Sequence, residues 1–516
     1  MKSKIKSHLW LASASPAKSI QSRKILMILL FAFTVGACTE KDPKPGNSLI
    51  ANAGADQHVK VMETVALDGR GSSDKANQTI TFKWEITKKP VNSTAQLTGA
   101  TSAQPTFIAD ASGDFEIQLT VSNGSETGTD KVLVVAAQLQ PVVIEKDITI
   151  PTVLEDRIAN PDFPDYIVSK DVAVKSQLTL HPGVVIAYAR DARFTIADKG
   201  GVLIAKGTPE RKIRFIGQQP VKGFWSGIML NSTSSGNILE YAEILHAGSQ
   251  TMLDNTKMAL AMFIESQAAI KNCLFSANDG YGLFIQEGAI LREFSTNTFT
   301  ANSQAGIRLP ADYVSILDQA SVFTGGNGRN VVEVIGAFLG NPNVKEEVTW
   351  KGFTDKTPYR LMNRIAVRTG WKLNPGVTIE VTGDAAIIIN EEAYLIAKGT
   401  ETNKIKFTGS TNTAAFWSGI LVHSQNQQNL IQYAEISNAG SIPLVSSEQA
   451  NLALYGDNAR MTVKNTRIAG SGGYGIWVGY GSLINADYAE SNIFENNKSV
   501  SVYGQLIENG RKAAKK

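Results

Sequence analysis

The residue types that most often perform catalysis are few and scattered in this 516-residue chain. His181 and His246 have no Ser or Cys beside them, and the Ser424 that follows His423 belongs to no nucleophile motif, so we expect all three histidines at turn or surface positions. The adjacent acid pairs are Glu346–Glu347 and Glu391–Glu392, and neighbours along a strand point to opposite faces. No zinc, phosphate-loop or EF-hand pattern occurs. The sequence therefore predicts no catalytic residue, no cofactor-binding residue and no metal ligand. Catalytic groups that are distant in sequence and come together only in the folded chain are the alternative.

Aromatic side chains near Gly-Tyr-Gly turns are the remaining candidates for contact with a ligand. Asp279 and Tyr281 lie at one such turn, and Tyr474, Trp477 and Tyr480 lie at and after another. Aromatic faces can stack on sugars because they bury apolar C–H surface. A tyrosine between glycines can also simply cover the corner of a repetitive scaffold, and we favour that structural role.

Cys38 is the residue whose position predicts a definite modification. Residues 1–37 contain six basic residues and no acid, and they end in the short apolar run Ile25–Ala37. This run is too short to span a bilayer comfortably, and the order of basic, apolar and small residues is typical of a secretory signal. "VGAC" resembles the lipobox of bacterial lipoproteins, which implies that Cys38 is lipidated and becomes the new N-terminus. An unprocessed anchor or an ordinary cysteine is the alternative.

The residues after Cys38 predict a tether and indicate a location. "TEKDPKPGNS" is polar and rich in Pro and Gly, which is typical of a flexible linker. Thr39 is not the Asp of the best-known inner-membrane retention signal, and the charged residues that follow loosely resemble surface-export signals of Bacteroidota lipoproteins. The resemblance implies an outer-membrane protein, lipid-anchored and facing the cell surface, with a periplasm-facing orientation as the alternative. Beyond residue 37 the chain has 44 basic and 47 acidic residues, so no nucleic-acid partner is expected.

Short alternating strands fill residues 49–138. In "TITFKWEIT", Phe82, Trp84 and Ile86 fall on one side, and Asn-Gly and Thr-Gly turns close a later hairpin. This pattern predicts a β-sandwich with Trp84 in its core. "VALDGRGSSD", "ITFKWEI" and "PTFIADASGDFEIQLTVSNG" resemble PKD domains, which are extracellular spacers or binding modules.

Three aspartates of this segment are candidate ligands for a calcium ion. Asp68, Asp74 and Asp110 could hold calcium, which prefers several oxygen ligands. Such residues also serve ordinary turns, and that is the interpretation we favour.

A long internal repeat determines the expected fold of the remaining chain. "LIAKGTPERKIRFIG" (203–217) matches "LIAKGTETNKIKFTG" (395–409), and "FWSGI" at Phe224–Ile228 recurs 192 residues later at Phe416–Ile420. A unit of about 190 residues is therefore duplicated in tandem. Within each unit, short strands separated by Gly, Asn, Asp and Ser predict coils of about 20–25 residues, as in strand-based solenoids.

The repeat motifs resemble the right-handed parallel β-helix of pectin-lyase-like proteins, over roughly 168–503. The fold class is therefore all-β: a PKD-type sandwich followed by this solenoid in two tandem copies. We expect Ile228 and Ile420 to pack inward and Trp225 and Trp417 to cover a coil corner rather than bind sugar. Asparagines at the coil turns are expected to pair with the backbone and with each other: Asn272, Asn297, Asn302, Asn465, Asn492 and Asn497.

Residues 310–370 break the rhythm and join the copies, with a protruding loop expected around Asn341–Lys345. One continuous solenoid is expected, and two separate solenoids are the alternative. Residues 140–169 should shield the open N-terminal end. The predicted domains are: signal peptide 1–37; lipidated tether 38–48; PKD-like sandwich 49–138; linker and N-terminal cap 139–177; first copy 178–310; connecting coils 311–370; second copy 371–508; basic tail 509–516.

Two functions follow as hypotheses. The first is a non-enzymatic surface lipoprotein whose β-helix binds glycan or protein. The second is a polysaccharide lyase or glycoside hydrolase, which the fold resemblance allows although the polygalacturonase motifs are missing. The expected partners are the membrane, through the lipid, and a polysaccharide or surface protein.

Overall fold

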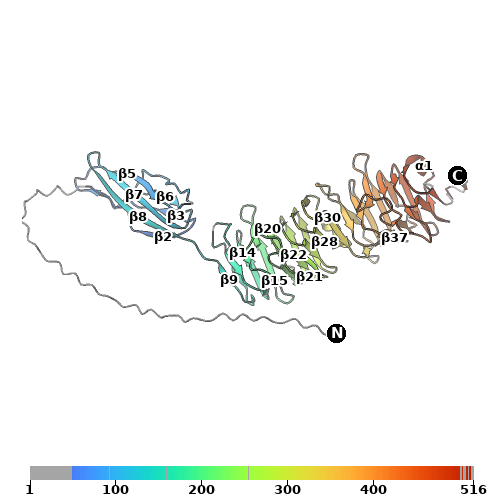
Figure 1. Ribbon diagram of the computed structural model, residues 1–516, viewed down its shortest axis with the longest axis horizontal. Helices are drawn as coiled ribbons and strands as arrows, with labels where there is room; N and C mark the ends of the chain where they lie inside the picture. Colours follow the sequence, from blue (N-terminus) through green and yellow to red (C-terminus); the bar gives the residue numbers. More distant parts are fainter. Residues whose placement is uncertain are drawn as a thin grey trace, which may run out of the picture.

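The computed structural model describes residues 49–499 except 92, 159 and 254, and three short later strands, β49 (Val502–Tyr503), β50 (Ile507–Glu508) and β51 (Arg511–Lys512). The predicted signal peptide, Cys38, the tether and most of the basic tail lie outside these residues. Within the described chain, no helix has the length and apolar character needed to cross a membrane. A sandwich and a solenoid follow one another along the chain (Figure 1).

The first unit is a small sandwich in which the strands pair antiparallel, except that β2 (Gln57–Lys60) pairs in parallel with β8 (Thr127–Ala137). Trp84 is 3% exposed, and its indole N–H donates to the carbonyl of Ser102 over 3.1 Å, so the predicted core role is correct. Alternate residues of β7 pack around it. The main sheet has the order β2 (Gln57–Lys60), β8 (Thr127–Ala137), β7 (Gly113–Ser122), β5 (Thr81–Lys88); β3 (Thr64–Ala66) pairs with β6 (Thr106–Ile108), and β1 (Leu49–Ile50) with β4 (Ser73–Asp74).

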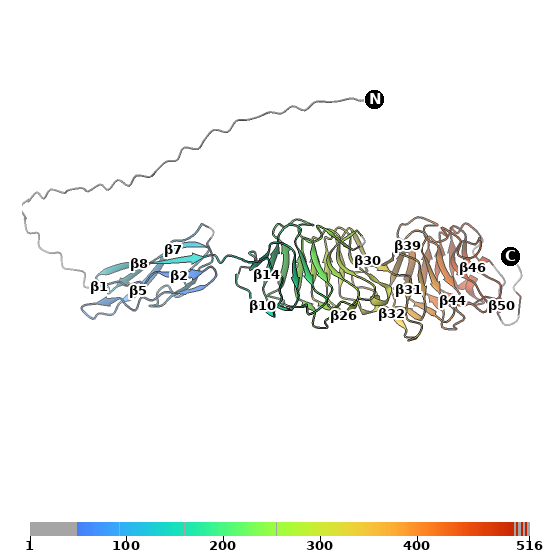
Figure 2. The ribbon, with the colours of Figure 1, turned by 90° about the horizontal axis from the view of Figure 1, so that it is seen from below.

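The solenoid has three parallel strands in each coil, and one of its sheets runs through both copies. Inward side chains of all three strands form one core cluster that spans the two copies, so the solenoid is continuous (Figure 2). The long sheet contains β12 (Val172–Val174), β15 (Arg193–Ile196), β18 (Gly227–Leu230), β22 (Thr256–Met262), β25 (Tyr281–Ile285), β28 (Ala305–Pro310), β30 (Arg329–Ile335), β33 (Tyr359–Leu361), β36 (Thr378–Val381), β39 (Ile405–Gly409), β42 (Ala434–Ser437), β45 (Arg467–Ala469) and β48 (Ile493–Glu495), with β21 (Thr251–Leu253) added to β22.

The other two sides of the coil each contain two shorter sheets, one per copy. Sheet A1 has β10 (Thr152–Leu154), β13 (Gln177–Leu180), β16 (Val202–Lys206), β19 (Ile238–Glu240), β23 (Gln267–Lys271) and β26 (Ile290–Ser295). Sheet B1 has β9 (Val142–Ile144), β11 (Tyr166–Val168), β14 (Val185–Tyr188), β17 (Ile213–Gly217), β20 (Ala242–Leu245), β24 (Leu274–Ser276), β27 (Thr298–Thr300) and β29 (Val322–Gly325).

In the second copy, sheet A2 has β31 (Phe338–Leu339), β34 (Ile365–Val367), β37 (Ala386–Ile389), β40 (Gly419–Val422), β43 (Ala450–Leu454), β46 (Tyr474–Val478) and β49. Sheet B2 has β32 (Val348–Trp350), β35 (Gly370–Leu373), β38 (Tyr394–Lys398), β41 (Leu430–Gln432), β44 (Arg460–Lys464) and β47 (Leu483–Ile484). Two short helices, the 3₁₀ helix η1 (Ala311–Ile316) and α1 (Tyr488–Ser491), complete the elements.

The two copies are rotated by one sheet position about the solenoid axis. From β12, β15, β18, β22 and β25 of the long sheet the chain enters sheet A1. From the long-sheet strands of the second copy it enters sheet A2, so sheets A1 and A2 share a side. Yet the "FWSGI" strand is β18 of the long sheet in the first copy and β40 of sheet A2 in the second. Matching strands therefore face different directions, which the repeat pattern did not indicate.

The segment expected to cap the solenoid contributes strands to it. β9, β10 and β11 lie within residues 140–169 and pair in parallel with each other or with the next coil. This segment is therefore the first coil rather than a separate cap. At the other break in rhythm, residues 341–347 are all exposed, as expected for the protruding loop.

The tryptophans of the duplicated motif lie inside the coil. Trp225 and Trp417 are both 0% exposed, and their indole N–H groups donate to the carbonyls of Leu245 and Ser437 over 2.7 and 2.8 Å. The expectation of a structural role is correct, but these rings fill the core and do not cover a corner from outside. Gly227 and Gly419 adopt φ of 116° and 125°, a region that favours glycine.

Candidate functional site

The candidate ligand-contact residues of the two copies lie on different sides of the solenoid. Tyr281 begins β25 of the long sheet, whereas its counterpart Tyr474 begins β46 of sheet A2. The rotation between copies separates them, so they form two sites rather than one. Each is described in turn.

Tyr281 is part of a buried charged cluster on the outer face of the long sheet. Its hydroxyl donates to Glu333 over 2.6 Å, and Glu333 is 0% exposed. Arg329 donates to the same carboxylate over 2.5 Å, and the Arg308 guanidinium lies 5.7 Å from the centre of the tyrosine ring. Burial, and then the hydrogen bond to Glu333, raise the pKa of the Tyr281 phenol. At 4% exposure this tyrosine has little surface to offer a ligand.

Asp279, two residues before Tyr281, is held by hydrogen bonds from neighbouring coils. Lys257 and Ser303 donate to its two carboxylate oxygens over 2.8 and 2.7 Å. Burial acts to raise the pKa of Asp279, but these two hydrogen bonds outweigh it and hold the pKa below its usual value. The carboxylate thus joins three coils, which is a structural contribution.

The second-copy candidates form an aromatic group on sheet A2. Trp477 is 8% exposed and packs with Ile388 and Leu421 in an apolar cluster on the outer face of that sheet. Tyr474 lies against the same cluster. Tyr480, in contrast, is 82% exposed. Only this last residue of the five candidates presents most of its ring to solvent.

A pocket of about 470 Å³ opens where the two copies join. It lies between η1, the exposed loop and β32, where sheets A1 and B1 have ended and sheets A2 and B2 begin. Three carboxylates and one amine are among the residues that line it, so the acid pair from the connecting segment faces a concave surface. Its charged lining is Asp312, Glu346, Glu347 and Lys351.

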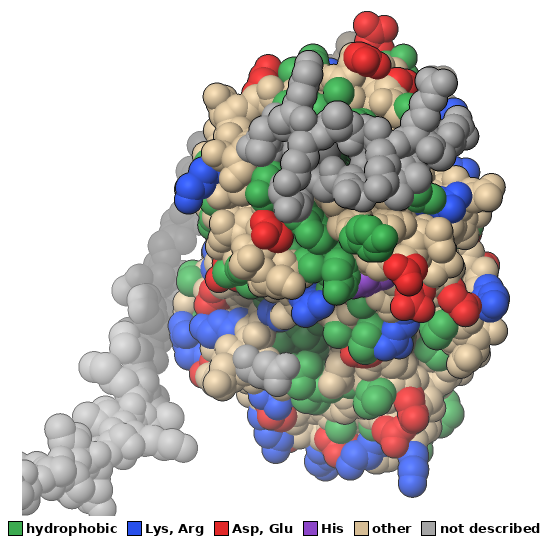
Figure 3. Space-filling view, turned by 90° about the vertical axis from the view of Figure 1, so that its right-hand side faces the viewer, with side chains coloured by type: hydrophobic (Ala, Val, Ile, Leu, Met, Phe, Trp, Pro, Cys, Tyr) green, Lys and Arg blue, Asp and Glu red, His purple; other side chains and the backbone are tan. Residues whose placement is uncertain are grey.

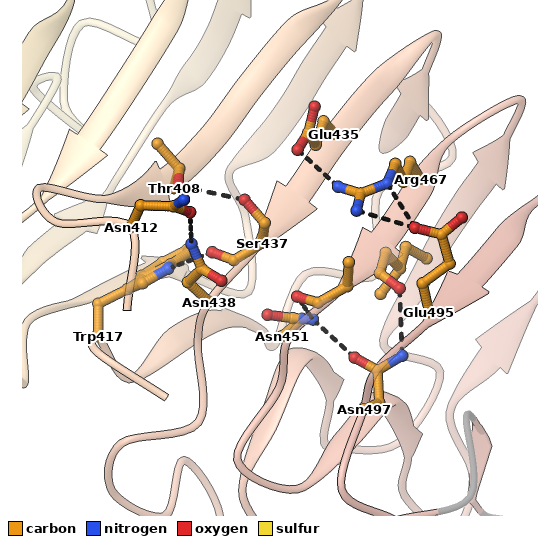
Figure 4. Close-up of polar contacts among 12 residues, drawn as sticks. Thr408, Asn412, Trp417, Glu435, Ser437, Asn438, Asn451, Arg467, Glu495 and Asn497 are labelled. Carbon is orange, nitrogen blue, oxygen red and sulfur yellow. Dashed lines mark hydrogen bonds and ion pairs between the residues drawn. The ribbon is translucent and has the colours of Figure 1, made fainter. Parts of the chain in front are cut away.

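Ion pairs occupy the other carboxylates of the long sheet. Arg360 donates twice to Glu380, over 2.8 and 2.6 Å. Further along, Arg467 lies between Glu435 and Glu495 and is 2.8 Å from each (Figure 4). These pairs match acids with bases from adjacent coils.

The buried asparagines form short ladders between coils. Asn278 donates to Asn302 and Asn302 to Asn327, each over 2.9 Å, and Asn451 donates to Asn497 over 3.2 Å (Figure 4). The expected pairing is therefore present. Asn272 and Asn465 instead occupy the left-handed conformation, with φ of 54° and 50°, and Asn297 and Asn492 donate to backbone carbonyls.

Three histidines and the second cysteine have the following surroundings in the described chain. His181 lies 2.5 Å from Glu155, His423 contacts the carbonyl of Tyr455, and His246 turns the chain at a φ of 66°. Burial, then Arg214, lowers the pKa of His246. Burial raises the pKa of the Cys273 thiol to about 12, which keeps it unreactive.

The three sandwich aspartates have separate protein partners. Asp68 pairs with Arg70 at 2.7 Å, Asp74 accepts from Asn123, and Asp110 accepts from Ser93. Across the described residues, no group of three or more His, Cys, Asp or Glu is placed to hold a metal ion.

Sequence reasoning missed Glu333, Arg308, Arg329 and Asp312. Arg329 and Glu333 pair within β30, but the contacts of Glu333 and Arg308 with Tyr281 form only through stacking of coils. Glu333 lies 52 residues from Tyr281, and no local pattern marks the pair. The signal that could have been used is an acid between two valines in "VVEVIG", where a buried strand predicts a partner for the carboxylate.

Comparisons with known proteins agree with this two-part organisation. Residues 53–136 match a family model for a PKD domain, and residues 192–312 match the model "Right handed beta helix region". The chain thus contains a PKD-like domain followed by a right-handed parallel β-helix. No curated protein matches the chain.

Two solved structures show partial similarity. A nucleoside hydrolase-related hypothetical protein from Saccharophagus degradans, described as associated with carbohydrate metabolism, is 22% identical over 17% of this chain, with a TM-score of 0.16. The chain covers only 25% of the length of that protein. The PKD domain from the KIAA 1837 protein is 27% identical, and the match covers 19% of this chain and 93% of that domain, also with a TM-score of 0.16.

Proposed function

We propose that this chain is a lipid-anchored protein of the bacterial cell surface that binds glycan or protein with its β-helix and does not cleave it. The PKD-like domain and β-helix together are typical of surface or binding-type proteins. Lipid on Cys38 would hold the chain at the outer membrane. The sandwich would then act as a spacer, and the long sheet, with 13 strands in its path, extends about 60 Å.

The state of the carboxylates is the observation that carries the non-enzymatic part of this proposal. Glycoside hydrolysis needs an accessible carboxyl group with a raised pKa to act as the general acid. Burial outweighs three backbone N–H donors and raises the pKa of Asp165. The pKa values of these other carboxyl groups are lowered: Asp68, Asp110, Glu116, Asp147, Asp191, Asp279, Asp355 and Asp487. Asp165 is 0% exposed, so no substrate can reach it.

The surface charges also support a binding role without a strongly charged partner. In Figure 3, acidic and basic side chains are interspersed over the C-terminal end of the molecule. Nucleic-acid recognition would favour a continuous basic surface. A neutral glycan or a mixed protein surface suits this pattern better.

Glycan cleavage is the second candidate, and the junction pocket favours it. Asp312, Glu346 and Glu347 line the same concave surface together with Lys351. These are the residue types that hydrolases and lyases of polysaccharides employ.

One experiment separates the two functions. The protein from residue 39 onward is applied to a polysaccharide array, and both binding and new reducing or unsaturated ends are scored. We expect binding without product. Product formation that Glu346→Gln or Glu347→Gln abolishes, while an exposed control such as Glu401→Gln does not, would replace the binding function with the enzymatic one.

The anchor is tested separately by membrane fractionation. The full chain should partition with membranes, and Cys38→Ala should release it. A Cys38→Ala protein that partitions like the parent would show that lipid is not the anchor.

A further inference from the structure

An exposed aromatic row follows one edge of sheet A2 in the second copy. His423, Tyr455 and Gly479 come directly after β40, β43 and β46, and the N–H of each later residue donates to the coil before it: Tyr455 to Val422 and Gly479 to Leu454. The Tyr455 ring therefore lies one coil from that of His423, about 4.8 Å in the direction of the axis. On the next coil Gly479 is in register with Tyr455, and Tyr480 follows it at the same edge. Tyr455 is 47% exposed and Tyr480, next to Gly479, is 82% exposed.

The row is held in place by contacts beneath and between the rings. The Tyr455 ring centre lies 6.0 Å from that of His423 and 6.2 Å from that of Trp477. His423 Nδ1 is 2.8 Å from the Tyr455 carbonyl, which ties the two coils together. The N–H of Asn458 donates to the carbonyl of Gly481 over 2.9 Å, so the turns that follow the two tyrosines are also joined. The Tyr455 ring, fixed by these contacts, loses little conformational freedom when it binds a ligand.

The chemistry around the row selects among possible ligands. Exposed rings spaced along a line stack best on a ligand that repeats an apolar face at a similar interval, as the C–H faces of a polysaccharide do. Asp457 lies beside the Tyr480 turn, since a Cβ at Gly481 would be 3.0 Å from its carboxylate oxygen. This carboxylate can accept hydrogen bonds from hydroxyl groups and would repel an anionic polymer.

We propose that Tyr455 and Tyr480 form a binding platform for an extended neutral polysaccharide that lies along the solenoid axis on the edge of sheet A2. This inference rests on the binding function proposed above and names its site and ligand class. The first copy has no such platform, because Asn231, Phe263 and Glu287 stand where His423, Tyr455 and Tyr480 stand in the second.

The test measures binding of the detergent-solubilised full chain to hydroxyethylcellulose, galactomannan, arabinoxylan and the anionic polymer alginate. At least one neutral polymer should bind. Tyr455→Ala and Tyr480→Ala should each weaken that binding by about tenfold, the upper range for one aromatic contact. The ring-retaining double variant Tyr455→Phe/Tyr480→Phe should bind within about twofold of the parent, and Phe163→Ala, at another exposed aromatic residue, should have no effect.

Three outcomes overturn the platform. Binding that survives when Tyr455→Ala and Tyr480→Ala are combined in one variant places the ligand elsewhere and leaves the proposed binding function intact. A preference for alginate contradicts the neutral ligand class. Failure to bind any polymer, together with failure on the array, removes the glycan-binding function as well.

Discussion

The two copies of the repeat share their interior and differ on their exterior. In each, a buried serine and an asparagine five residues later form the same contacts: Asn237 donates to Ser232 Oγ over 2.9 Å, and Asn429 to Ser424 Oγ over 2.8 Å. On the outer face, both matching tyrosines pack in an apolar cluster, but Tyr281 also donates a hydrogen bond to the buried carboxylate of Glu333, which Arg329 contacts as well. The coil needs the interior to close, whereas the outer face is free to acquire a site.

The largest expected effect breaks the shared interior. Trp225→Ala and Trp417→Ala should each lower the free energy of unfolding by about 3–5 kcal/mol, because each leaves a cavity in the core. The loss should be about 1 kcal/mol larger for Trp225→Ala. The centre of the Trp225 ring lies 3.9 Å from that of Tyr188, with which it stacks, whereas the second copy has Val381 at the position of Tyr188. Urea unfolding measures both, with the exposed Tyr480→Ala as control. An equal or larger cost for Trp417→Ala would show that the stack adds nothing.

The second prediction compares an ion pair of the long sheet in the connecting coils with one in the second copy. Arg329→Met should cost about 2–3 kcal/mol because it leaves the buried Glu333 carboxylate without its main counter-charge. Arg467→Met should cost no more than about 1 kcal/mol, since its partners are partly exposed. Unfolding in low and high salt measures the difference. A salt-sensitive loss at Arg329 as small as that at Arg467 would contradict the role of burial.

The third prediction tests whether the serine–asparagine contact is equivalent in both copies. The side-chain oxygens of Asn237 and Asn429 accept the N–H groups of Leu203 and Leu395, each over 2.9 Å. Replacing either asparagine by alanine should cost about 1–3 kcal/mol, because a buried N–H loses its acceptor. Gln428→Ala, next to the second site but exposed, is the matched control. If the two losses of unfolding free energy differ by more than about 1 kcal/mol, the contact contributes unequally to stability in the two copies although its geometry is the same.

The smallest expected effect concerns acid. Asp279 has a pKa lowered by Lys257 and Ser303, and the second copy has Gly472 in its place. A lowered folded-state pKa adds stability that is present above the ordinary value of about 4 and is lost as the pH falls through the folded value. Asp279→Asn should therefore reduce the fall in melting temperature between pH 7 and pH 3. An unchanged fall would show that other carboxylates account for it.

The sequence predicted the elements better than their placement. The alternation in "TITFKWEIT" and the paired "FWSGI" motifs were sufficient for the sandwich, the solenoid and the duplication. They could not reveal the rotation between the copies. The sheet that each strand of residues 310–370 joins is determined by pairing with distant coils, which no local pattern encodes. Tyr281 could be named as a candidate, but its burial by Glu333, Arg308 and Arg329 depends on coils that stack above it. Tyr455 was missed because its exposure is decided by neighbouring coils.

The rotation between the copies limits how far duplication could raise the affinity of the protein for a target through bivalent binding. Two equal sites on one side could grip a flat target together, and the second contact would benefit from a high effective concentration. Here the matching faces lie on two different sides of the three-sided coil. A planar target can meet only one of them at a time, so bivalent attachment requires a surrounding mesh that reaches two sides at once. Under the proposed binding function, duplication in this chain would thus increase the number of directions from which a ligand can be bound rather than the avidity for one target.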